Sequence, residues 1–401
     1  MLWEKSDIVN KVIVVSDLHF GKSDTYAQNV TNKVPFSQFV DKLIEVGDVA
    51  ELVIAGDFLD EWIIPLSCPP HDNSSQHYRD CLANNKVVVD ALNRAMDAGI
   101  KVVYVIGNHD MTLEAEVLQE AMPKLVQARD ARGLGVYYTG VRNEIAIEHS
   151  HRYEAYSAPD TVTNRELAGN DDTILPPGYF YARLGTQWVI EGQPTVKVSY
   201  PVIDEAPQSD DLDQMGAYLH YKVMTEMLLS KFTPRVEFDE KVFDMKIGGL
   251  NGKYSEKDLC PCKQASGRIS APVLYPDFQR TWRERMRVNR VAVPMSFIEA
   301  VKGASEIPYF RRQASVQYLD RPETGIDVVV FGHTHVPDFH DYGNGRYYLN
   351  DGTWIDSNLD GDYTCTFALI ESGDVDTARI LRYCEDGSIE DISNHATDAT
   401  G

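Results

Sequence analysis

The sequence predicts an α/β protein built on a parallel sheet, with a functional site at the carboxyl ends of its strands. Strand and helix patterns alternate over residues 11–110, which is typical of parallel strands joined by right-handed crossovers. In addition, four apolar runs each stop at residue types that bind metal ions, at 11–15, 51–56, 101–106 and 327–331. Ligands of such sheets bind where the strands end, so we expect these residues to meet.

The first part of the chain supplies most of the predicted sheet. β-branched residues mark its strands, and apolar residues spaced three or four apart mark its helices. In chain order we predict a strand at 11–17, a helix at 36–46, a strand at 51–57, a helix at 78–98, a strand at 101–107, a helix at 113–129, and an antiparallel pair at 136–139 and 143–148.

Residues 152–324 interrupt this pattern. They lack strands that end in ligand residues, and they contain turns such as Pro176-Pro177-Gly178 and several helical stretches. A segment of 173 residues is too long to be a structureless loop inside a compact domain. We therefore predict a large, mostly helical insert or cap at 152–324, between two parts of one core at 1–151 and 325–401.

Strand patterns return after the insert, at 327–331, 346–349, 364–370 and 376–383. Tyr342-Gly343-Asn344-Gly345 precedes the second of these strands. Asn-Gly pairs favour the tight turns that join antiparallel strands, so this sequence predicts a hairpin.

Composition narrows the class of partner. The formal net charge is −23, from 61 acidic against 38 basic residues, which argues against a nucleic-acid-binding surface. It is compatible with a small anionic, phosphate-containing substrate, because bound cations reverse the local sign of charge. The sequence leaves the oligomeric state open.

Location is predicted from what the sequence lacks. No apolar run approaches the roughly 18 residues of a transmembrane segment, and the first residues do not resemble a signal peptide. The six cysteines are too scattered for a disulfide framework, which favours the cytoplasm. Cys260-Pro-Cys262 has no second pair at zinc-site spacing, so we interpret it as an ordinary loop.

Seven candidate metal ligands follow the strands: Asp17, His19, Asp57, Asn108, His149, His333 and His335. This mixture of carboxylate, imidazole and amide suits Mn²⁺, our prediction, with Fe or Zn²⁺ as alternatives. Seven ligands are too many for one ion, so we predict two divalent ions with Asp57 as the bridge. Such a pair, about 3.5–4 Å apart, can clamp a phosphate and supply a metal-activated hydroxide for in-line attack.

The motifs also resemble a known family. Asp17-x-His19, Gly56-Asp57-x-x-Asp60, Gly107-Asn108-His109-Asp110, His149 and Gly332-His333-x-His335 are similar, in this order, to the five-block signature of calcineurin-like metallophosphoesterases of bacterial type. The resemblance covers residues 11–151 and 325–371. It implies two mixed β-sheets packed as a sandwich flanked by helices, in four layers.

The resemblance also implies roles for the residues. One metal would be held by Asp17, His19, Asp57 and His335, and the other by Asp57, Asn108, His149 and His333. His109 would be catalytic, as a proton donor or charge stabiliser beside the phosphate. Asp110 would orient His109, and Asp60 would fix the orientation of a ligand.

Other interpretations remain beside the phosphoesterase. A lone Asp17 or Asp57 can be a turn former and Asn108 a helix cap, but buried acids and histidines that converge without a metal are costly. A scaffold that has lost its metals is a second alternative. A metal-storage or regulatory binding module is a third alternative, but it would not explain the open site or the presence of His109.

A finer resemblance concerns the substrate. Gly56-Asp57-Phe-Leu-Asp60-Glu-Trp62 is similar to UDP-2,3-diacylglucosamine hydrolases, which makes a nucleotide-sugar or lipid pyrophosphatase an alternative. Tyr348-Leu-Asn350-Asp-Gly352-Thr-Trp354 resembles the Asn-Thr-Gly-Ser-Trp stretch of the wider class. Those hydrolases usually carry Arg where His109 stands, and they lack the insert.

One segment of the insert stands out by its charge. Residues 277–291 have a helical pattern in which Phe278, Trp282 and Met286 share a face. A neighbouring stripe holds Arg280, Arg283, Arg287 and Arg290. This arginine stripe suits phosphate binding, and the alternative is a set of ion pairs with surface carboxylates.

Overall fold

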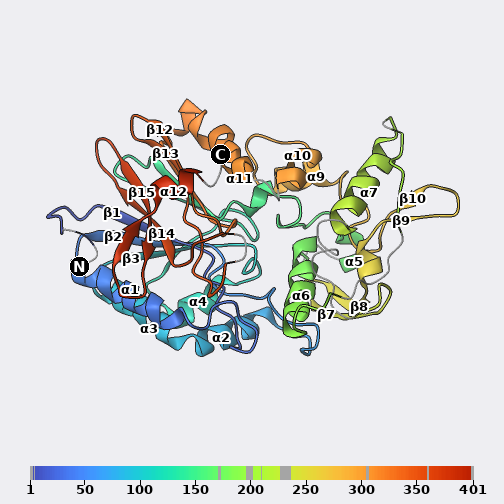
Figure 1. Ribbon diagram of the computed structural model, residues 1–401, viewed down its shortest axis with the longest axis horizontal. Helices are drawn as coiled ribbons and strands as arrows, with labels where there is room; N and C mark the ends of the chain where they lie inside the picture. The colour runs from blue at the N-terminus through green and yellow to red at the C-terminus, as the bar shows by residue number, and fades with distance from the viewer. Residues whose placement is uncertain are drawn as a thin grey trace. The chain divides into compact units, whose positions relative to one another are not determined.

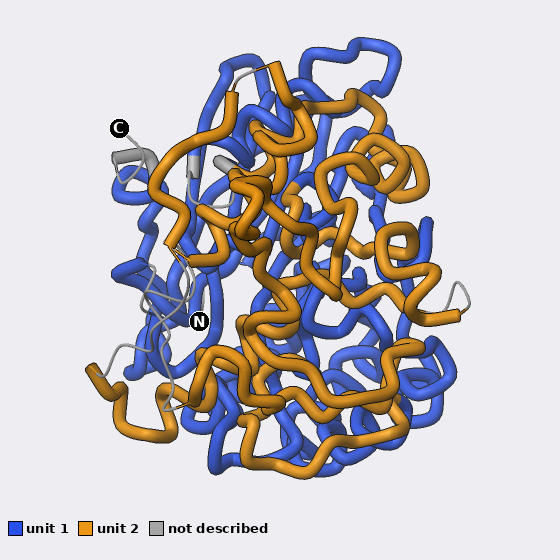
Figure 2. The backbone as a smooth tube through the Cα atoms, turned by 90° about the vertical axis from the view of Figure 1, so that its right-hand side faces the viewer, with its two compact units in different colours: residues 1–61, 75–153, 302–401 blue, residues 62–74, 154–301 orange. Residues whose placement is uncertain are grey.

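The computed structural model describes residues 3, 5–169, 173–195, 202–208, 210–225, 236–303, 307–358 and 361–398. The chain forms two compact units (Figure 2). Unit 1 comprises residues 1–61, 75–153 and 302–401, and unit 2 comprises residues 62–74 and 154–301. The units assign 62–74, 152–153 and 302–324 differently from the domains predicted above, whose boundaries stay a prediction.

A seven-stranded mixed sheet forms the centre of unit 1 (Figure 1). β1, β2, β3 and β4 are parallel neighbours, whereas β14 pairs antiparallel with β1 and leads to antiparallel β15 and β16. The strands are β1 Lys11–Val15, β2 Val49–Ala55, β3 Lys101–Val105, β4 Val126–Ala128, β14 Thr366–Glu371, β15 Thr377–Tyr383 and β16 Ile389–Asp391.

A second mixed sheet, of five strands, completes unit 1. β11 pairs parallel with both β6 and β13, and antiparallel strands β5 and β12 form the two edges. The strands are β5 Val136–Thr139, β6 Ile145–Glu148, β11 Val328–Phe331, β12 Asp338–Gly343 and β13 Arg346–Asn350. The hairpin predicted at 342–345 is confirmed, since it joins β12 to β13.

The alternation of side chains along β1 shows how the layers are packed. Val12 and Val14 belong to an apolar core shared with strands of the second sheet, including β6 and β11. Ile13 and Val15 face the other way and pack in the core beneath the helices. Both faces of β1 are therefore buried, which explains its continuous apolar sequence. The predicted fold class, two mixed sheets flanked by helices, is confirmed.

Helices cover the outer faces of both sheets. α1 and α3 contribute their apolar residues to the core on the outer face of the seven-stranded sheet, and the turn Ser315–Leu319 lies against β11. The helices of unit 1 and the helical turns are α1 Lys33–Val46, α2 Ser74–Asn84, α3 Lys86–Asp97, α4 Ala115–Ala121, His151–Tyr153, α11 Ile307–Ala314, Ser315–Leu319, Pro322–Thr324 and α12 Ser393–Asp398.

Two predicted helices were wrong in extent. The helix expected at 78–98 is divided into α2 and α3 at Asn85, whose side-chain amide donates to the Gly21 carbonyl. The helix expected at 113–129 ends at Ala121 as α4, and residues 126–128 form β4 instead. Pro123 explains the early end, because proline cannot donate the backbone hydrogen bond that would extend the helix.

Unit 2 combines helices with two β-hairpins, β7–β8 and β9–β10. Its elements are α5 Arg165–Ala168, α6 Pro177–Ile190, α7 Leu212–Lys222, β7 Phe243–Ile247, β8 Leu250–Tyr254, α8 Glu256–Leu259, β9 Cys262–Lys263, β10 Ile269–Ser270, α9 Trp282–Val288 and α10 Phe297–Gly303, whose last two residues fall in unit 1.

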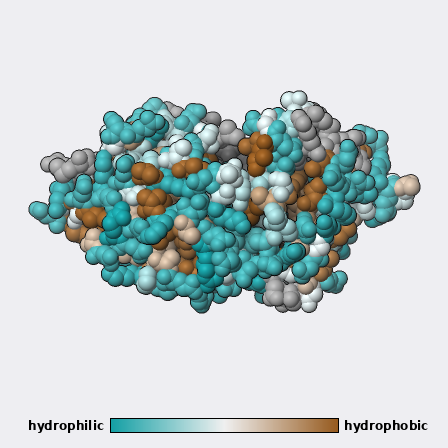
Figure 3. Space-filling model, turned by 90° about the horizontal axis from the view of Figure 1, so that it is seen from below, coloured by the Kyte–Doolittle hydropathy of each residue, from teal (hydrophilic) through white to brown (hydrophobic). Residues whose placement is uncertain are grey.

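The surface is mainly polar on the face that Figure 3 shows, where hydrophobic side chains form small separate patches. Among the described residues, no helix has both the length and the hydrophobicity needed to span a bilayer.

Candidate metal centre

The predicted ligands lie in the loops that leave the carboxyl ends of the strands. Several of them adopt left-handed backbone angles, which non-glycine residues rarely do. The φ angles are 52° at Asp17, 46° at His19, 51° at Asp57, 79° at His333 and 60° at His335. Strained conformations of this kind persist where the surroundings hold them, and they cluster at functional sites.

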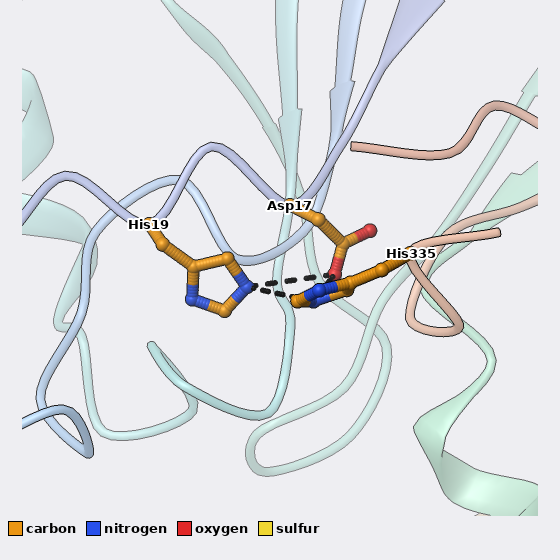
Figure 4. Close-up of side chains that lie close together, drawn as sticks. All are labelled: Asp17, His19 and His335. Carbon is orange, nitrogen blue, oxygen red and sulfur yellow. Dashed lines mark hydrogen bonds and ion pairs between the residues drawn. The ribbon is translucent and has the colours of Figure 1, made fainter. Parts of the chain in front are cut away.

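Asp17, His19 and His335 form one group that could hold a metal ion. Figure 4 shows both imidazole rings converging on the Asp17 carboxylate, one from the loop after β1 and the other from the loop after β11. His335 Nε2 lies 3.2 Å from Asp17 Oδ1 and 3.1 Å from His19 Nε2. Asp17 Oδ1 is buried and has no hydrogen-bond partner among the described residues.

Asp57 connects this group to a second one. Its carboxylate belongs to one possible ligand group with Asp17 and His149, and to another with His19 and His109. Asp57 Oδ2 lies 3.2 Å from His149 Nε2 and 3.6 Å from His19 Nε2. A carboxylate between two sets of imidazoles is the arrangement that a bridging ligand requires.

The other predicted ligands lie around His149. Asn108 Oδ1 is 2.9 Å from His149 Nε2. The ring of His333 lies 5.2 Å from that of His149 and 5.6 Å from that of Phe310, centroid to centroid. The described residues thus bring Asn108 and His333 next to His149, although neither belongs to the carboxylate–imidazole groups described above.

Neighbouring acceptors fix the tautomers of two histidines. His19 Nδ1 is 2.7 Å from Asp60 Oδ2, and His149 Nδ1 is 2.8 Å from the Ala55 carbonyl oxygen. Each Nδ1 therefore carries the hydrogen and donates it, which leaves Nε2 as the atom that can bind a metal.

His109 is held from two sides. Its backbone N–H donates to Asp57 Oδ1 at 2.8 Å, and its ring Nδ1 lies 3.0 Å from Asp60 Oδ2. Asp110, which was expected to orient His109, accepts backbone hydrogen bonds from Phe58 at 2.8 Å and Gly107 at 2.7 Å. The structure thus places Asp60 against the His109 ring, while Asp110 ties together the loops after β2 and β3.

Charge explains the protonation tendencies of the metal-free site. Burial opposes the imidazolium of His149, but the Asp57 and Asp17 carboxylates outweigh it and raise the pKa of His149 to about 9. Burial likewise opposes ionisation of Asp17, yet His149 and His335 hold its pKa well below the ordinary value. Burial and the nearby His149 lower the pKa of His333 to about 3.

Two glycines make the close approach of these loops possible. A Cβ atom on Gly56, whose φ is +96°, would lie 2.5 Å from the ring of His149. A Cβ on Gly107 would lie 2.2 Å from Asp57 Oδ1. Both positions therefore exclude larger residues, which accounts for the glycine in each of these motifs.

Several buried residues that support the site were missed by the sequence analysis. Ser16 and Asp351 lie behind Asp17, and Thr353 Oγ1 donates to the Asp17 carbonyl oxygen at 2.8 Å. Glu61 accepts a hydrogen bond from the Thr112 hydroxyl. The stretch 348–354 had been noted only for its resemblance, and nothing in the sequence indicated its contacts.

The donor set fits the divalent ions that the motifs predict. Buried carboxylates and imidazoles that can present Nε2 to a metal suit Mn²⁺, Fe or Zn²⁺. The buried Asp17 Oδ1, which has no hydrogen-bond partner among the described residues, is the most direct observation, because an anionic oxygen in that position is costly unless a cation or donor reaches it. The fold and this cluster fit a metal-dependent hydrolase.

Comparison with known proteins gives the family. A model described as calcineurin-like phosphoesterase matches residues 10–189, which contain the motifs from Asp17 to His149 but not His333 or His335. The resemblance is confirmed over this part of the sequence: the chain carries a calcineurin-like phosphoesterase segment. A search of curated proteins gave no match.

Solved structures that are similar to this chain include the following three. A nuclease MPE from Pseudomonas putida is 22% identical over 29% of this chain and 46% of that chain, with a TM-score of 0.20. A dimetal phosphatase from Danio rerio is 11% identical over 96% of both chains, with a TM-score of 0.35. A putative 5'-nucleotidase from Staphylococcus aureus is 12% identical over 96% of this chain and 52% of that chain, with a TM-score of 0.32. These scores are too low to support an argument about substrate.

Proposed function

We propose that this chain is a dinuclear-metal-dependent phosphoesterase that hydrolyses a phosphate ester or anhydride. The observation that carries the proposal is the buried Asp17 Oδ1, which faces Nε2 atoms of two histidines without a hydrogen-bond partner among the described residues. The proposed ligands of one ion are Asp17, His19, Asp57 and His335, and those of the other are Asp57, Asn108, His149 and His333.

The metal ions supply the electrophilic part of the chemistry, since two adjacent divalent ions neutralise phosphate oxygens and lower the pKa of a bound water. We propose Mn²⁺ as the native ion. The contribution of the protein is to hold the ligands in place: Asp60 fixes the His19 ring, and the Ala55 carbonyl fixes the His149 ring.

His109 is proposed as the residue that protonates the leaving oxygen. Its Nδ1 lies 3.0 Å from Asp60 Oδ2, and this contact orients the ring. Because Nδ1 is engaged by Asp60, Nε2 is the ring atom from which a hydrogen would reach the substrate. Asp60 thus orients both a metal ligand and the proton donor.

The substrate class that fits is a small anionic compound containing phosphate. Arg283 and Arg287 of unit 2 are exposed, and their side chains make no ion pair or hydrogen bond among the described residues, so they are available to an anionic group. Arg280, in contrast, pairs with Asp277. A cytoplasmic location stays a prediction.

Elemental analysis and a substrate panel test this function. Purified protein should contain close to two divalent ions per chain, and it should hydrolyse p-nitrophenyl phosphate or its bis ester when Mn²⁺ is added. Phosphomonoesters, cyclic nucleotides and nucleotide-sugar diphosphates then identify the bond cleaved. Metal-replete protein that hydrolyses none of them would favour the non-catalytic scaffold.

A further inference from the structure

A buried carboxylate directly precedes the proposed ligand His149. Glu148 is the last residue of β6 and is 1% exposed. Ile145 and Ile147 of the same strand belong to the core between the two sheets. Because side chains alternate along a strand, Glu148 points to the opposite face of the five-stranded sheet. Whatever holds Glu148 therefore holds the end of the strand from which His149 emerges.

Three donors surround this carboxylate. Arg152 Nε forms an ion pair with Glu148 Oε2 at 2.8 Å, and the hydroxyls of Tyr153 and Tyr318 donate to Oε1 at 2.5 and 2.9 Å. A buried carboxylate is costly unless it is paired and hydrogen-bonded, so this cluster keeps Glu148 in one place. Arg152 and Tyr153 lie in the turn just after β6, whereas Tyr318 is 170 positions from Glu148.

The segment that carries Tyr318 also reaches a second proposed ligand. It consists of α11 and the turn Ser315–Leu319. Phe310 of α11 is 4% exposed, and its ring meets the His333 ring edge to face, with 5.6 Å between the centroids. One segment of the chain thus contacts one imidazole ligand directly and the neighbour of another.

The turn at the end of this segment explains how Tyr318 reaches β6. Tyr309, nine residues earlier, donates its hydroxyl hydrogen to the Tyr153 carbonyl at 2.6 Å. At about 3.6 residues per turn, a separation of nine residues puts two side chains on opposite faces of a regular α-helix. The turn Ser315–Leu319 is π-helical, however, and is closed by a 2.8 Å hydrogen bond between residues five apart. Its additional residue rotates Tyr318 back toward the side of Tyr309, and such turns are frequent at functional sites.

We propose that Tyr318 is a positioning residue for the second ion, which is the one proposed to bind Asp57, Asn108, His149 and His333. By its hydrogen bond to Glu148, Tyr318 fixes the end of β6 and therefore the position of His149. It acts through the strand and not by contact with the ion. The first ion shares only the Asp57 bridge with this ligand set, so it should depend little on Tyr318. The inference rests on the proposed function.

Tyr318→Phe tests this role, because it removes the hydroxyl and keeps the ring that packs in the segment. Calorimetry should show that the second Mn²⁺ binds about 10-fold more weakly, the lower end of the effect of losing a group that orients a ligand, while the first is within about threefold of native. Electron paramagnetic resonance provides a second readout. At a Mn²⁺ concentration that fills the native protein, the native spectrum should be that of a coupled pair, and the variant should show the signal of isolated Mn²⁺.

A second variant tests whether Tyr318 acts through Glu148. Glu148→Gln keeps an oxygen that can accept from Tyr318 but loses the charge that pairs with Arg152, so it should also weaken the second ion. If the two side chains act as one unit, the two losses should not add in the double variant Tyr318→Phe with Glu148→Gln. Fully additive losses would contradict the proposed route through Glu148.

Tyr342→Phe is the matched control, since the Tyr342 hydroxyl contacts Ser315 Oγ at 2.9 Å at an exposed position on the same segment. It should bind both ions like the native protein. Native affinity for both ions in Tyr318→Phe, or equal weakening of both, would overturn the inference. Native protein that binds no Mn²⁺ would instead overturn the proposed metal centre on which the positioning role depends.

Discussion

His109 and Asp57 lie in contact, yet the account gives them different roles. The backbone N–H of His109 donates to Asp57 Oδ1, whereas its ring faces Asp60. Removing the ring should therefore leave most of the ligand set intact. Removing the Asp57 carboxylate should instead disrupt the ligand set.

His109→Ala should retain both metal ions but lower turnover by roughly 10²–10⁴-fold, the range for losing a positioned proton donor. The loss should shrink for substrates with good leaving groups, because these need little protonation. The comparison of p-nitrophenyl phosphate with an alkyl phosphate measures this. Collapse of metal binding in the variant would show instead that His109 is a ligand or a structural support.

Metal binding should release protons near neutral pH. The pKa of His149 is raised to about 9, so its imidazole is protonated at pH 7 and must lose that proton to bind a metal. Mn²⁺ affinity should therefore rise between pH 7 and pH 9. Calorimetry in buffers of different ionisation enthalpy counts the released protons, and a pH-independent affinity would contradict the assignment of His149.

The raised pKa of His149 predicts that the stability of the metal-free protein falls with pH, whereas Mn²⁺ affinity rises. A raised folded-state pKa stabilises the fold below the ordinary value of 6.5, and this contribution is lost as pH rises through about 9. The melting temperature of the apoprotein should therefore fall over that interval. The metal-bound protein, in which His149 is already neutral, should not share this decline.

The residues of the site could be predicted because each follows a strand. Strand ends in a parallel sheet meet in space, so the apolar runs before Asp17, Asp57 and Asn108 were enough to bring them together. Ser16 and Asp351 could not be found in this way, because they are 335 positions apart and an ordinary serine and aspartate carry no pattern. Their contact depends on how β1 packs against β11 and β13 in the core between the two sheets.

At the scale of elements, the loops after the strands determine the geometry. Gly107 follows strand β3, at a position where a side chain would collide with Asp57. Gly107→Ala should therefore destabilise the protein by about 1–3 kcal/mol, the usual cost of overpacking, and should weaken metal binding. Denaturant unfolding with and without Mn²⁺ measures both effects.

A matched control is Gly373→Ala. At Gly373 the nearest atom to an added Cβ is 3.7 Å away, which is ordinary contact. This substitution should be close to neutral. Equal destabilisation by the two alanines would contradict the steric explanation at Gly107.

The elements that could not be predicted are short or interrupted. β4 has three residues and follows Pro123, and its pattern does not differ from the end of a helix. Asn85 divides α2 from α3 through hydrogen bonds to the carbonyls of Gly21 and Cys81. The first bond is tertiary and the second is local, and neither can be inferred from the spacing of apolar residues. Long buried strands such as β1 were predicted because both faces of the strand are apolar.

At the scale of the whole molecule, unit 2 is the part whose purpose depends on the substrate. The helical segment predicted at 277–291 is shorter in the structure, since α9 spans Trp282–Val288 and Phe278 precedes it. The three apolar residues are nevertheless buried together as predicted: Phe278, Trp282 and Met286 are 2%, 2% and 3% exposed. Arg285, outside the predicted arginine stripe, is fully buried and pairs with Asp160. Arg283, Arg287 and Arg290 of the stripe are exposed and can meet an anion.

Arg283→Ala combined with Arg287→Ala should raise KM for a large substrate of the panel, such as a nucleotide-sugar diphosphate, and change kcat little. A small aryl phosphate should be unaffected and serves as the internal control. Steady-state kinetics on both substrates measures this. Equal effects on the two, or a simple loss of stability, would reduce the stripe to a structural role.

The most direct test of the metal centre is the metal content of Asp57→Asn, measured beside its rate. Asp57 is the carboxylate shared by the two proposed ligand sets, so the variant should fall from about two ions per chain to less than one, with turnover reduced more than about 100-fold. Asp374→Asn, at an exposed acid, is the matched control and should keep both ions and full activity. Two bound ions with near-native turnover in Asp57→Asn would contradict the account.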